Sequence, residues 1–447
     1  MAVRTSEYAG RKVRRALWML AGCITLALCL LITACSDDDS PLADLEEEGE
    51  EEEEETAPRT VLAYMVGDNK SSSASDLSSL LKANIDSMVV GMESVTEGVM
   101  LIFCKFSTSD YSYLYRLKSK NGTVTADTLY TFSDINPLAC ETMGNIINMA
   151  FTAYPAESYG LIFASHGEGW VPASTSAGIS LGTSLSGTDA HETGADDDGR
   201  LSESVIAQQY IGMYRNTAMD IDDFATALVN GGEHLDFLLW DACFMQSVEV
   251  AYELREQVDY FIGSPTEIPG PGADYAQVTP TLFLTSDDYA TSIAQAYYQP
   301  YADKYTGQSP TSNTNWTGGV SISVIASAGL DALATQSKAL FDTYEFDGTV
   351  SDIMSYDCRS YRYYYDLDGL ASHLTDENED YDAWREALDA VVPTWLTTAK
   401  NYSSSGGMFS MSGSSGLSTF IPSSSTSSTR LAYYQGYQWS EDTGWAQ

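Results

Sequence analysis

The sequence predicts an α/β fold: a mostly parallel sheet sandwiched by helices, with a C-terminal α/β lobe packed against it. The chain has 447 residues, 44% of them hydrophobic, which is enough to bury a large core. It contains nearly continuous apolar runs, which are typical of parallel strands buried on both faces. Helix-like segments separate the runs, and this alternation favours parallel strands joined by helical crossovers. The clearest runs are residues 61–66, 99–106, 159–167 and 234–244.

The N-terminal 35 residues resemble a secretory signal that ends in a lipid-attachment site. Basic residues up to Arg15 precede an apolar stretch, residues 16–34, as in exported precursors. This stretch approaches the ~20 residues that span a bilayer, so a permanent transmembrane helix is the alternative. Residues 32–35, Ile-Thr-Ala-Cys, are similar to a bacterial lipobox. That similarity implies cleavage before Cys35 and lipidation of its thiol.

An acidic segment follows this site. Residues 36–55 contain 13 acidic residues and no basic one, so residues 36–58 are interpreted as a disordered, self-repelling tether. The Ser-Asp-Asp-Asp sequence directly after Cys35 also resembles the export tag of surface lipoproteins in some Gram-negative bacteria. We therefore expect the protein at the outer membrane or cell surface, attached to the membrane through its lipid anchor.

Residues 59–275 are expected to form the first folded domain. A helix is predicted from Asp76 onward, after the first strand. Residues 171–216 form a long polar insertion, and such a loop in a compact domain is usually functional or disordered. The remaining predicted elements are a hairpin or pair of edge strands at 111–119 and 123–132, helices at 145–154 and 220–230, a helix after residue 244, and a strand at 259–265 followed by a Gly/Pro-rich loop.

Residues 276–447 are expected to form the second lobe. A helix at 286–305, a strand at 319–327 and a further helix ending at Tyr344 are predicted there. A helix is also predicted at 382–399, with a kink or break at Pro393, and a short strand at 416–422.

Charge and cysteine content limit the functions open to the chain. The chain carries 22 Lys and Arg against 63 Asp and Glu, for a net charge of −41. A phosphate-binding surface needs clustered cations, so a nucleic acid is excluded as a partner, whereas cationic ligands are attracted. Once the signal is removed and Cys35 is lipidated, Cys104, Cys140, Cys243 and Cys358 remain, which permits at most two disulfides in an oxidising compartment.

Two predicted strands carry reactive side chains at their carboxyl ends. One strand leads to His166 and the other to Cys243, 77 residues later. Open parallel sheets bind ligands at this edge, so the two side chains are expected to meet there. A cysteine nucleophile needs a base that takes its proton and later protonates the leaving amine. We also expect Cys243 to start a helix, whose positive end would lower the pKa of the thiol.

The other candidates for a cysteine and its base are less well placed. Cys104 lies inside a predicted strand, where cysteine is usually a core residue. His234 precedes Cys243 by nine residues on the same strand, which is about 30 Å at ~3.3 Å per residue. His191 falls in the polar insertion and His373 in the second lobe, and neither follows a predicted strand.

These motifs together resemble the clostripain family of caspase-like cysteine peptidases. The similarity covers roughly residues 60–447 and includes Ser-His-Gly-Glu-Gly-Trp at 165–170 and Asp-Ala-Cys-Phe-Met at 241–245. It implies a caspase-like fold and an endopeptidase that cuts after Arg, or also Lys, in peptides and proteins. His166 would then be the general base and acid, and Cys243 the nucleophile. The N–H groups of Gly167 and Cys243 would form the oxyanion hole.

The resemblance also implies two acidic contacts for the basic P1 side chain. Asp241 is the first, and a helix N-cap is its alternative role. Asp274 is the best match for the second, although its loop, Pro-Gly-Pro-Gly-Ala-Asp, departs from the family pattern by lacking a Trp before the Asp. A pair of carboxylates would bind a guanidinium well.

Some relatives activate themselves by cleavage between the two catalytic residues, and some need calcium. In that interval the only basic residues are Arg200 and Arg215, and Arg200 lies in a polar loop, so we expect processing at Arg200. No cofactor is expected to be required. Asp196–Asp198 could bind calcium, but they lack the alternate spacing of an EF-hand loop, and a solvated acidic loop is the simpler interpretation.

Two other functions remain open from the sequence. One is a catalytically inactive peptidase fold that acts as a surface binding protein. The other is a glycan-binding lipoprotein, because 29 Tyr and 8 Trp could supply stacking surfaces for sugars. The intact pair of His166 and Cys243 favours the peptidase.

Overall fold

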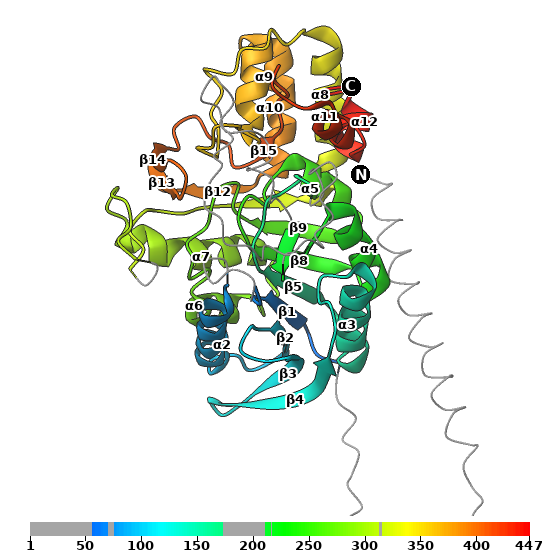
Figure 1. Ribbon diagram of the computed structural model, residues 1–447, viewed down its shortest axis with the longest axis vertical. Coiled ribbons are helices and arrows are strands. Elements are labelled where there is room, and N and C mark those ends of the chain that lie inside the picture. Colours follow the sequence, from blue (N-terminus) through cyan, green and yellow to red (C-terminus); the bar gives the residue numbers. More distant parts are fainter. Residues whose placement is uncertain (1–55, 70–75, 173–210, 216, 313–314) are drawn as a thin grey trace, which may run out of the picture. The chain divides into compact units, whose positions relative to one another are not determined.

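The computed structural model describes residues 56–69, 76–172, 211–215, 217–312 and 315–447. Residues Thr56–Gln447 belong to one compact unit, built around a nine-stranded sheet (Figure 1). The predicted lipidation site Cys35, residues 36–55 of the predicted tether, His191, Asp196–Asp198 and Arg200 lie outside the described residues. The prediction of disorder is wrong for the last three tether residues, 56–58, because Ala57 bridges to Ala156 and its carbonyl accepts from Glu157 N at 3.0 Å. Within the described part of the chain, no helix is both long and apolar enough to cross a bilayer.

The central sheet confirms the predicted fold class. Its strand order is β12-β10-β9-β8-β5-β1-β2-β3-β4, and the five strands from β9 to β2 run parallel. Antiparallel strands extend the sheet at both edges. The strands are β1 (Thr60–Val66), β2 (Val99–Lys105), β3 (Tyr111–Lys120), β4 (Thr123–Ser133), β5 (Tyr159–Ala164), β8 (Leu235–Asp241), β9 (Val258–Gly263), β10 (Ser321–Ala326) and β12 (Thr394–Thr397).

Helices cover both faces of this sheet, as parallel strands require. In Figure 1, α2, α6 and α7 lie on one face, and α3, α4 and α5 lie on the other. The remaining helices pack over the end of the second face. The helices are α2 (Ser78–Met92), α3 (Cys140–Ala153), α4 (Ile221–Gly231), α5 (Val248–Leu254), α6 (Tyr275–Thr281), α7 (Tyr289–Lys304), α8 (Leu330–Thr343), α9 (Leu367–Thr375), α10 (Glu379–Val391), α11 (Ser428–Tyr434) and α12 (Gln438–Thr443).

Short two-stranded sheets complete the described secondary structure. They pair β6 (Ile211–Tyr214) with β7 (Thr217–Met219), β11 (Tyr365–Asp366) with β15 (Ser418–Thr419), and β13 (Lys400–Ser403) with β14 (Gly407–Ser410). All three sheets are antiparallel.

Segments from both parts of the sequence contribute to the central sheet. β10 and β12 belong to residues 276–447, yet β10 pairs directly with β9 of the preceding part. Gln246, just after β8, donates through Nε2 to the Ser323 carbonyl on β10 at 2.7 Å. The expected boundary at residue 275 therefore does not coincide with an edge of the sheet.

One predicted element is wrong in its second half. The helix expected at 382–399 ends with α10 at Val391, and β12 follows directly after Pro393. Proline lacks the N–H that would continue the helix, and β12 pairs with β10 at the edge of the sheet. The chain after Pro393 therefore changes from a helical to an extended conformation.

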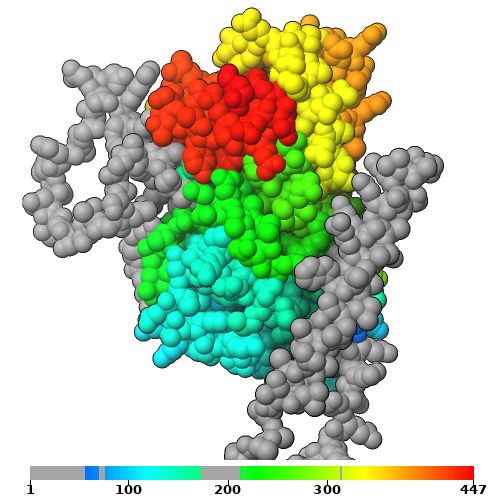
Figure 2. Space-filling view, turned by 90° about the vertical axis from the view of Figure 1, so that its right-hand side faces the viewer, coloured from blue at the N-terminus to red at the C-terminus, as the bar shows by residue number. Residues whose placement is uncertain are grey.

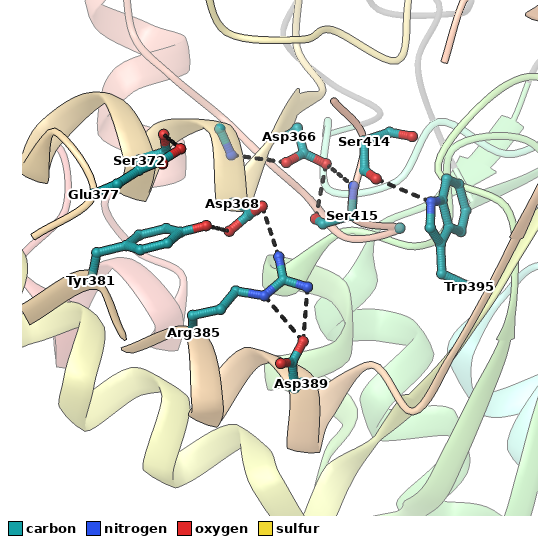
Figure 3. Close-up of polar contacts among 12 residues, drawn as sticks. Asp366, Asp368, Ser372, Glu377, Tyr381, Arg385, Asp389, Trp395, Ser414 and Ser415 are labelled. Carbon is teal, nitrogen blue, oxygen red and sulfur yellow. Dashed lines mark hydrogen bonds and ion pairs between the residues drawn. The ribbon is translucent and has the colours of Figure 1, made fainter. Parts of the chain in front are cut away.

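A buried polar network connects the C-terminal segments to one another (Figure 3). Asp366, the N-cap of α9, accepts hydrogen bonds from Gly369 N and from both the backbone N and Oγ of Ser415. The Ser414 carbonyl accepts from Nε1 of Trp395 on β12 at 3.1 Å. These bonds attach α9 and the loop before β15 to the edge of the central sheet.

Candidate active site

β5 and β8 are neighbours in the centre of the sheet, and their ends define the candidate site. Ala164 of β5 pairs with Asp241 of β8, so His166 and Cys243 each lie two residues beyond the same pair of partners. Gly167 packs directly on the turn that carries Cys243. A Cβ atom at Gly167 would lie 2.6 Å from the carbonyl oxygen of Cys243 and 2.9 Å from the Ala242 side chain. Only glycine fits this contact.

Cys243 lies in a tight turn that the following loop holds in place. Phe244 has a positive φ of 60°, which is unusual for a residue with a large side chain. Its N–H donates to the Thr266 carbonyl at 3.0 Å, and its ring stacks on Tyr364 with centroids 4.4 Å apart. The Ile268 N–H donates to the Cys243 sulfur at 3.4 Å. This hydrogen bond holds the sulfur against the loop, although Cys243 as a whole residue is partly exposed.

The expectation of a thiol activated by a helix is wrong. Helix α5 begins at Val248, five residues after Cys243, and its N-cap is Ser247. Burial and the negative charge of Glu267 raise the pKa of the Cys243 thiol to about 12, despite the hydrogen bond from Ile268. Burial of this kind favours the thiol form of Cys243 in the free protein.

A salt bridge that the sequence did not suggest clamps the loop after His166. Arg359 binds Glu168 in a bidentate geometry, with N···O distances of 2.6 and 2.7 Å. The Tyr364 hydroxyl donates to the Glu168 carbonyl oxygen at 2.6 Å, and the Arg359 guanidinium lies 4.8 Å from the centre of the Phe244 ring. Arg359 therefore joins the loop of His166 to the turn of Cys243.

Trp170, at the end of the same loop, is held by the C-terminal residues. Its Nε1 donates to the Tyr363 carbonyl at 3.2 Å, and its ring packs against Phe420 and Tyr434 at centroid distances of 4.5 and 5.1 Å. Trp170 is 1% exposed. The Gly-Glu-Gly-Trp sequence thus ends in the main core.

Asp241 is buried beside the site and already accepts several hydrogen bonds. Its side chain points toward α6 and α7, where it accepts from the Tyr275 hydroxyl at 2.9 Å, the Tyr297 hydroxyl at 2.8 Å and Ala273 N at 3.3 Å. Asp241 is 4% exposed, and burial raises its pKa against the effect of these donors. A side chain at Gly272 would collide with this carboxylate.

Asp274 is separate from Asp241 and more exposed. It precedes α6, and its carboxylate accepts from Gln277 Nε2 at 3.1 Å. It lines a cavity of about 210 Å³ together with Asn84, Tyr301 and Lys304. The structure therefore brings Asp241 and Asp274 to the same face of the sheet, but each has its own partners.

The described histidines outside the site have other partners. His234 Nε2 lies 2.8 Å from Asp259, and His373 lies 2.9 Å from Asp352 and 3.2 Å from Asp347. Cys104 is buried in β2, as predicted for a core residue. Among the described residues, no group of three His, Cys, Asp or Glu side chains could hold a metal ion.

Comparisons with known proteins give the family and the fold of the chain. A sequence model of the clostripain family matches residues 63–183 and 190–447. A secreted C11 cysteine protease from Bacteroides thetaiotaomicron, solved with an irreversible peptide inhibitor, is 36% identical with a TM-score of 0.72; the match covers 87% of this chain and 99% of that chain. A comparison with curated proteins found no match.

Two further solved structures have the same fold. An inactive zymogen C11 protease from Parabacteroides distasonis is 30% identical, with a TM-score of 0.69, and the match covers 87% of this chain and 99% of that chain. A second secreted C11 cysteine protease from Bacteroides thetaiotaomicron is 24% identical, with a TM-score of 0.70 and the same coverage, and this likeness concerns the fold alone.

Proposed function

The chain belongs to the clostripain family and is a cysteine-type peptidase; from this we propose that it is an exported, lipid-anchored endopeptidase that cleaves after arginine through Cys243 and His166. One observation carries the assignment of the two residues. They follow paired positions on adjacent parallel strands, and Gly167 contacts the turn of Cys243.

In this mechanism His166 removes the thiol proton, and the Cys243 sulfur attacks the carbonyl carbon of the scissile bond. The N–H groups of Gly167 and Cys243 stabilise the resulting oxyanion. His166 then gives its proton to the leaving amine, which leaves a thioester on Cys243. Water, deprotonated by His166, hydrolyses the thioester. The raised pKa of the Cys243 thiol supports a base-assisted attack rather than a permanently ionised sulfur.

For the arginine at P1, the proposed contacts are Asp241 and Asp274. Both carboxylates lie on the α6 and α7 face, next to the strand end that carries Cys243. Asp241 keeps acceptor capacity, because a carboxylate has about four lone-pair sites and three donors occupy them here. Lysine is the alternative at P1. The strongly acidic chain supports peptide or protein substrates that are cationic.

Self-processing is proposed at Arg200. The other basic residue of the interval, Arg215, is engaged, since its Nε lies 3.2 Å from the buried carboxylate of Asp68. A structural neighbour is described as a zymogen, which supports activation by cleavage in this chain as well. The Arg200→Ala variant should remain intact and inactive during purification, and clipping at an unchanged position would contradict the proposal.

Attachment to the membrane is proposed through Cys35, and export to the outer membrane or cell surface through the acidic residues that follow it. Neighbours described as secreted proteases support a location outside the cytoplasm. The Cys35→Ala variant should lose its lipid and its membrane attachment, as detected by fractionation and mass spectrometry.

The decisive experiment compares wild type with Cys243→Ala on a positional library of peptides. Wild type should cleave after arginine, and the variant should be inactive while it keeps the same melting temperature. An arginine-based electrophile should label Cys243 in wild type. If wild type is neither labelled nor active, the fold serves a binding function, and glycan binding would then be the function to test.

A further inference from the structure

A third acidic residue, Glu267, lies beside the nucleophile in the loop that follows β9. Its neighbours in sequence both contact the turn of Cys243: Thr266 accepts from Phe244 N at 3.0 Å, and Ile268 donates to the Cys243 sulfur at 3.4 Å. Glu267 therefore occupies the centre of the segment that borders the reactive sulfur. It is partly exposed, whereas Thr266 is fully buried.

The Glu267 carboxylate is held in one position. Oε1 accepts from the Ser403 hydroxyl at 2.7 Å, and Oε2 accepts from Ser404 N at 2.9 Å. Both donors belong to the end of β13 and its turn. Each carboxylate oxygen retains a further lone pair, because an ionised carboxylate accepts about four hydrogen bonds. No Lys, Arg or His of the described chain forms an ion pair with Glu267.

Glu267 differs from the nearby Glu168 in that it has no ion-pair partner within the described chain. Glu168 is already neutralised by the bidentate contact with Arg359. The charge of Glu267 raises the pKa of the Cys243 and Cys358 thiols, although Arg359 and Arg362 act on these thiols in the opposite direction. An anchored, partly exposed carboxylate that forms no ion pair within the described chain is suited to bind a cation of the substrate.

Glu267 has hydrogen-bond partners of its own, separate from those of the proposed P1 contact Asp241. Asp241 points toward the tyrosines of α6 and α7. Glu267 is bound by the β13–β14 hairpin and lies near Cys358 and Glu168. We therefore assign Glu267 to a different basic residue of the substrate from the one that reaches Asp241.

We propose that Glu267 determines specificity by binding a second basic side chain of the substrate, close to but distinct from P1. The protease would then select cationic sequences in which the arginine at the cleavage site has a basic neighbour. This inference rests on the proposed function, because it takes Cys243 as the nucleophile and arginine as the P1 residue.

The test uses peptides with arginine fixed at P1 and either lysine or its neutral counterpart norleucine at P3, P2, P1′ or P2′. Wild type should prefer lysine at one of these positions by about tenfold in kcat/KM, which corresponds to ~1.4 kcal/mol. Glu267→Gln should abolish that preference. Glu386→Gln, which changes an exposed glutamate on α10, is the matched control and should keep it.

The proposal is overturned if wild type shows no preference for lysine at any of the four positions. It is equally overturned if Glu267→Gln lowers kcat/KM for the lysine and norleucine peptides by the same factor, since Glu267 would then only position the loop.

A second measurement needs no peptide cleavage. Because Glu267 disfavours ionisation of the Cys243 thiol, Glu267→Gln should shift the pH profile of Cys243 alkylation by iodoacetamide to lower pH. An unshifted profile would contradict the placement of the charge. If this shift occurs while wild type cleaves no arginyl peptide, the proposed function fails for a reason unrelated to the placement of Glu267.

Discussion

At the scale of single residues, the site depends on a close contact between two backbone segments. Gly167 lies against the carbonyl of Cys243, and a backbone atom cannot move aside as the end of a flexible side chain can. Any side chain at residue 167 must therefore separate the loop of His166 from the turn of Cys243.

We expect Gly167→Ala to lower kcat/KM about 100-fold, because a displacement of about 1 Å between reacting groups has an effect of that size. Gly436→Ala is the matched control, since a Cβ atom there meets nothing closer than 3.4 Å. Steady-state kinetics and thermal melting of both variants test this. Full activity of Gly167→Ala would show that the two segments tolerate separation.

Asp357 is a buried acid close to Arg359, and its ionisation is expected to make the unfolding free energy of the protein depend on pH. Burial raises the pKa of Asp357 to about 7, although Arg359, Tyr363 N and Ser355 act in the opposite direction. A raised folded-state pKa means that the folded protein binds this proton more tightly than the unfolded chain does. The stabilisation is complete below about pH 4 and is lost as the pH rises to about 7.

The unfolding free energy of wild type should therefore fall between pH 4 and pH 7 relative to that of Asp357→Asn, by up to about 4 kcal/mol. Urea unfolding of both proteins at a series of pH values measures the difference between them. A difference that stays constant over this range would mean that Asp357 is ionised throughout.

At the scale of elements, the loop after β5 and the turn after β8 are held by a third segment. Arg359 and Tyr364 contact both the loop and the turn, although the two residues lie some 190 positions after Glu168 in the sequence. The guanidinium also covers the Phe244 ring, whose backbone has a positive φ. The strained turn is thus stabilised by packing from outside its own sequence.

Arg359→Met should lower the unfolding free energy by about 3–5 kcal/mol and reduce kcat/KM, because it leaves the Glu168 carboxylate without its cation. The double variant with Glu168→Gln should recover part of the stability. Urea unfolding of the four proteins of this cycle gives the coupling energy. Additive effects of the two substitutions would show that the pair is not coupled.

Sequence patterns predicted most of the sheet, and they placed His166 and Cys243 after two neighbouring strands, because both features depend on local order. The catalytic roles of these two residues stay a prediction. The buried strands have apolar runs, and His166 and Cys243 follow two of them directly. The same patterns did not indicate Arg359, Tyr364 or Glu267, since these residues reach the site through tertiary contacts with no local signature. The thiol pKa was mispredicted for the same reason: it depends on burial and on Glu267, not on the start of a helix.

At the scale of the whole molecule, the C-terminal residues are attached through a buried carboxylate to α5, a helix that covers the central sheet. Oε1 of Glu249 on α5 accepts from Thr419 Oγ1, Phe420 N and the Tyr434 hydroxyl, each at 2.9 Å. In Figure 2 the C-terminal residues, in red, lie next to the green part of the chain. Tyr252 of α5 also donates to Asp442 of α12 at 2.8 Å.

Glu249→Ala should destabilise the protein by about 3 kcal/mol, because it leaves three buried donors without their acceptor. Glu256→Ala, at an exposed position just after α5, should change the melting temperature little. Differential scanning calorimetry of the two variants distinguishes these outcomes. Equal effects would mean that the C-terminal residues are held by apolar packing alone.

The contacts of Arg359 with Glu168 and Phe244 can form only late in the synthesis of the chain. Synthesis proceeds from the N-terminus, and early segments begin to fold before later ones exist. A ribosome-bound chain that has emerged only to residue 350 contains His166 and Cys243 but lacks Arg359, Tyr364 and the hairpin that fixes Glu267. The loop of His166 and the turn of Cys243 are then unsupported, so the arrangement proposed for catalysis forms only with the last quarter of translation.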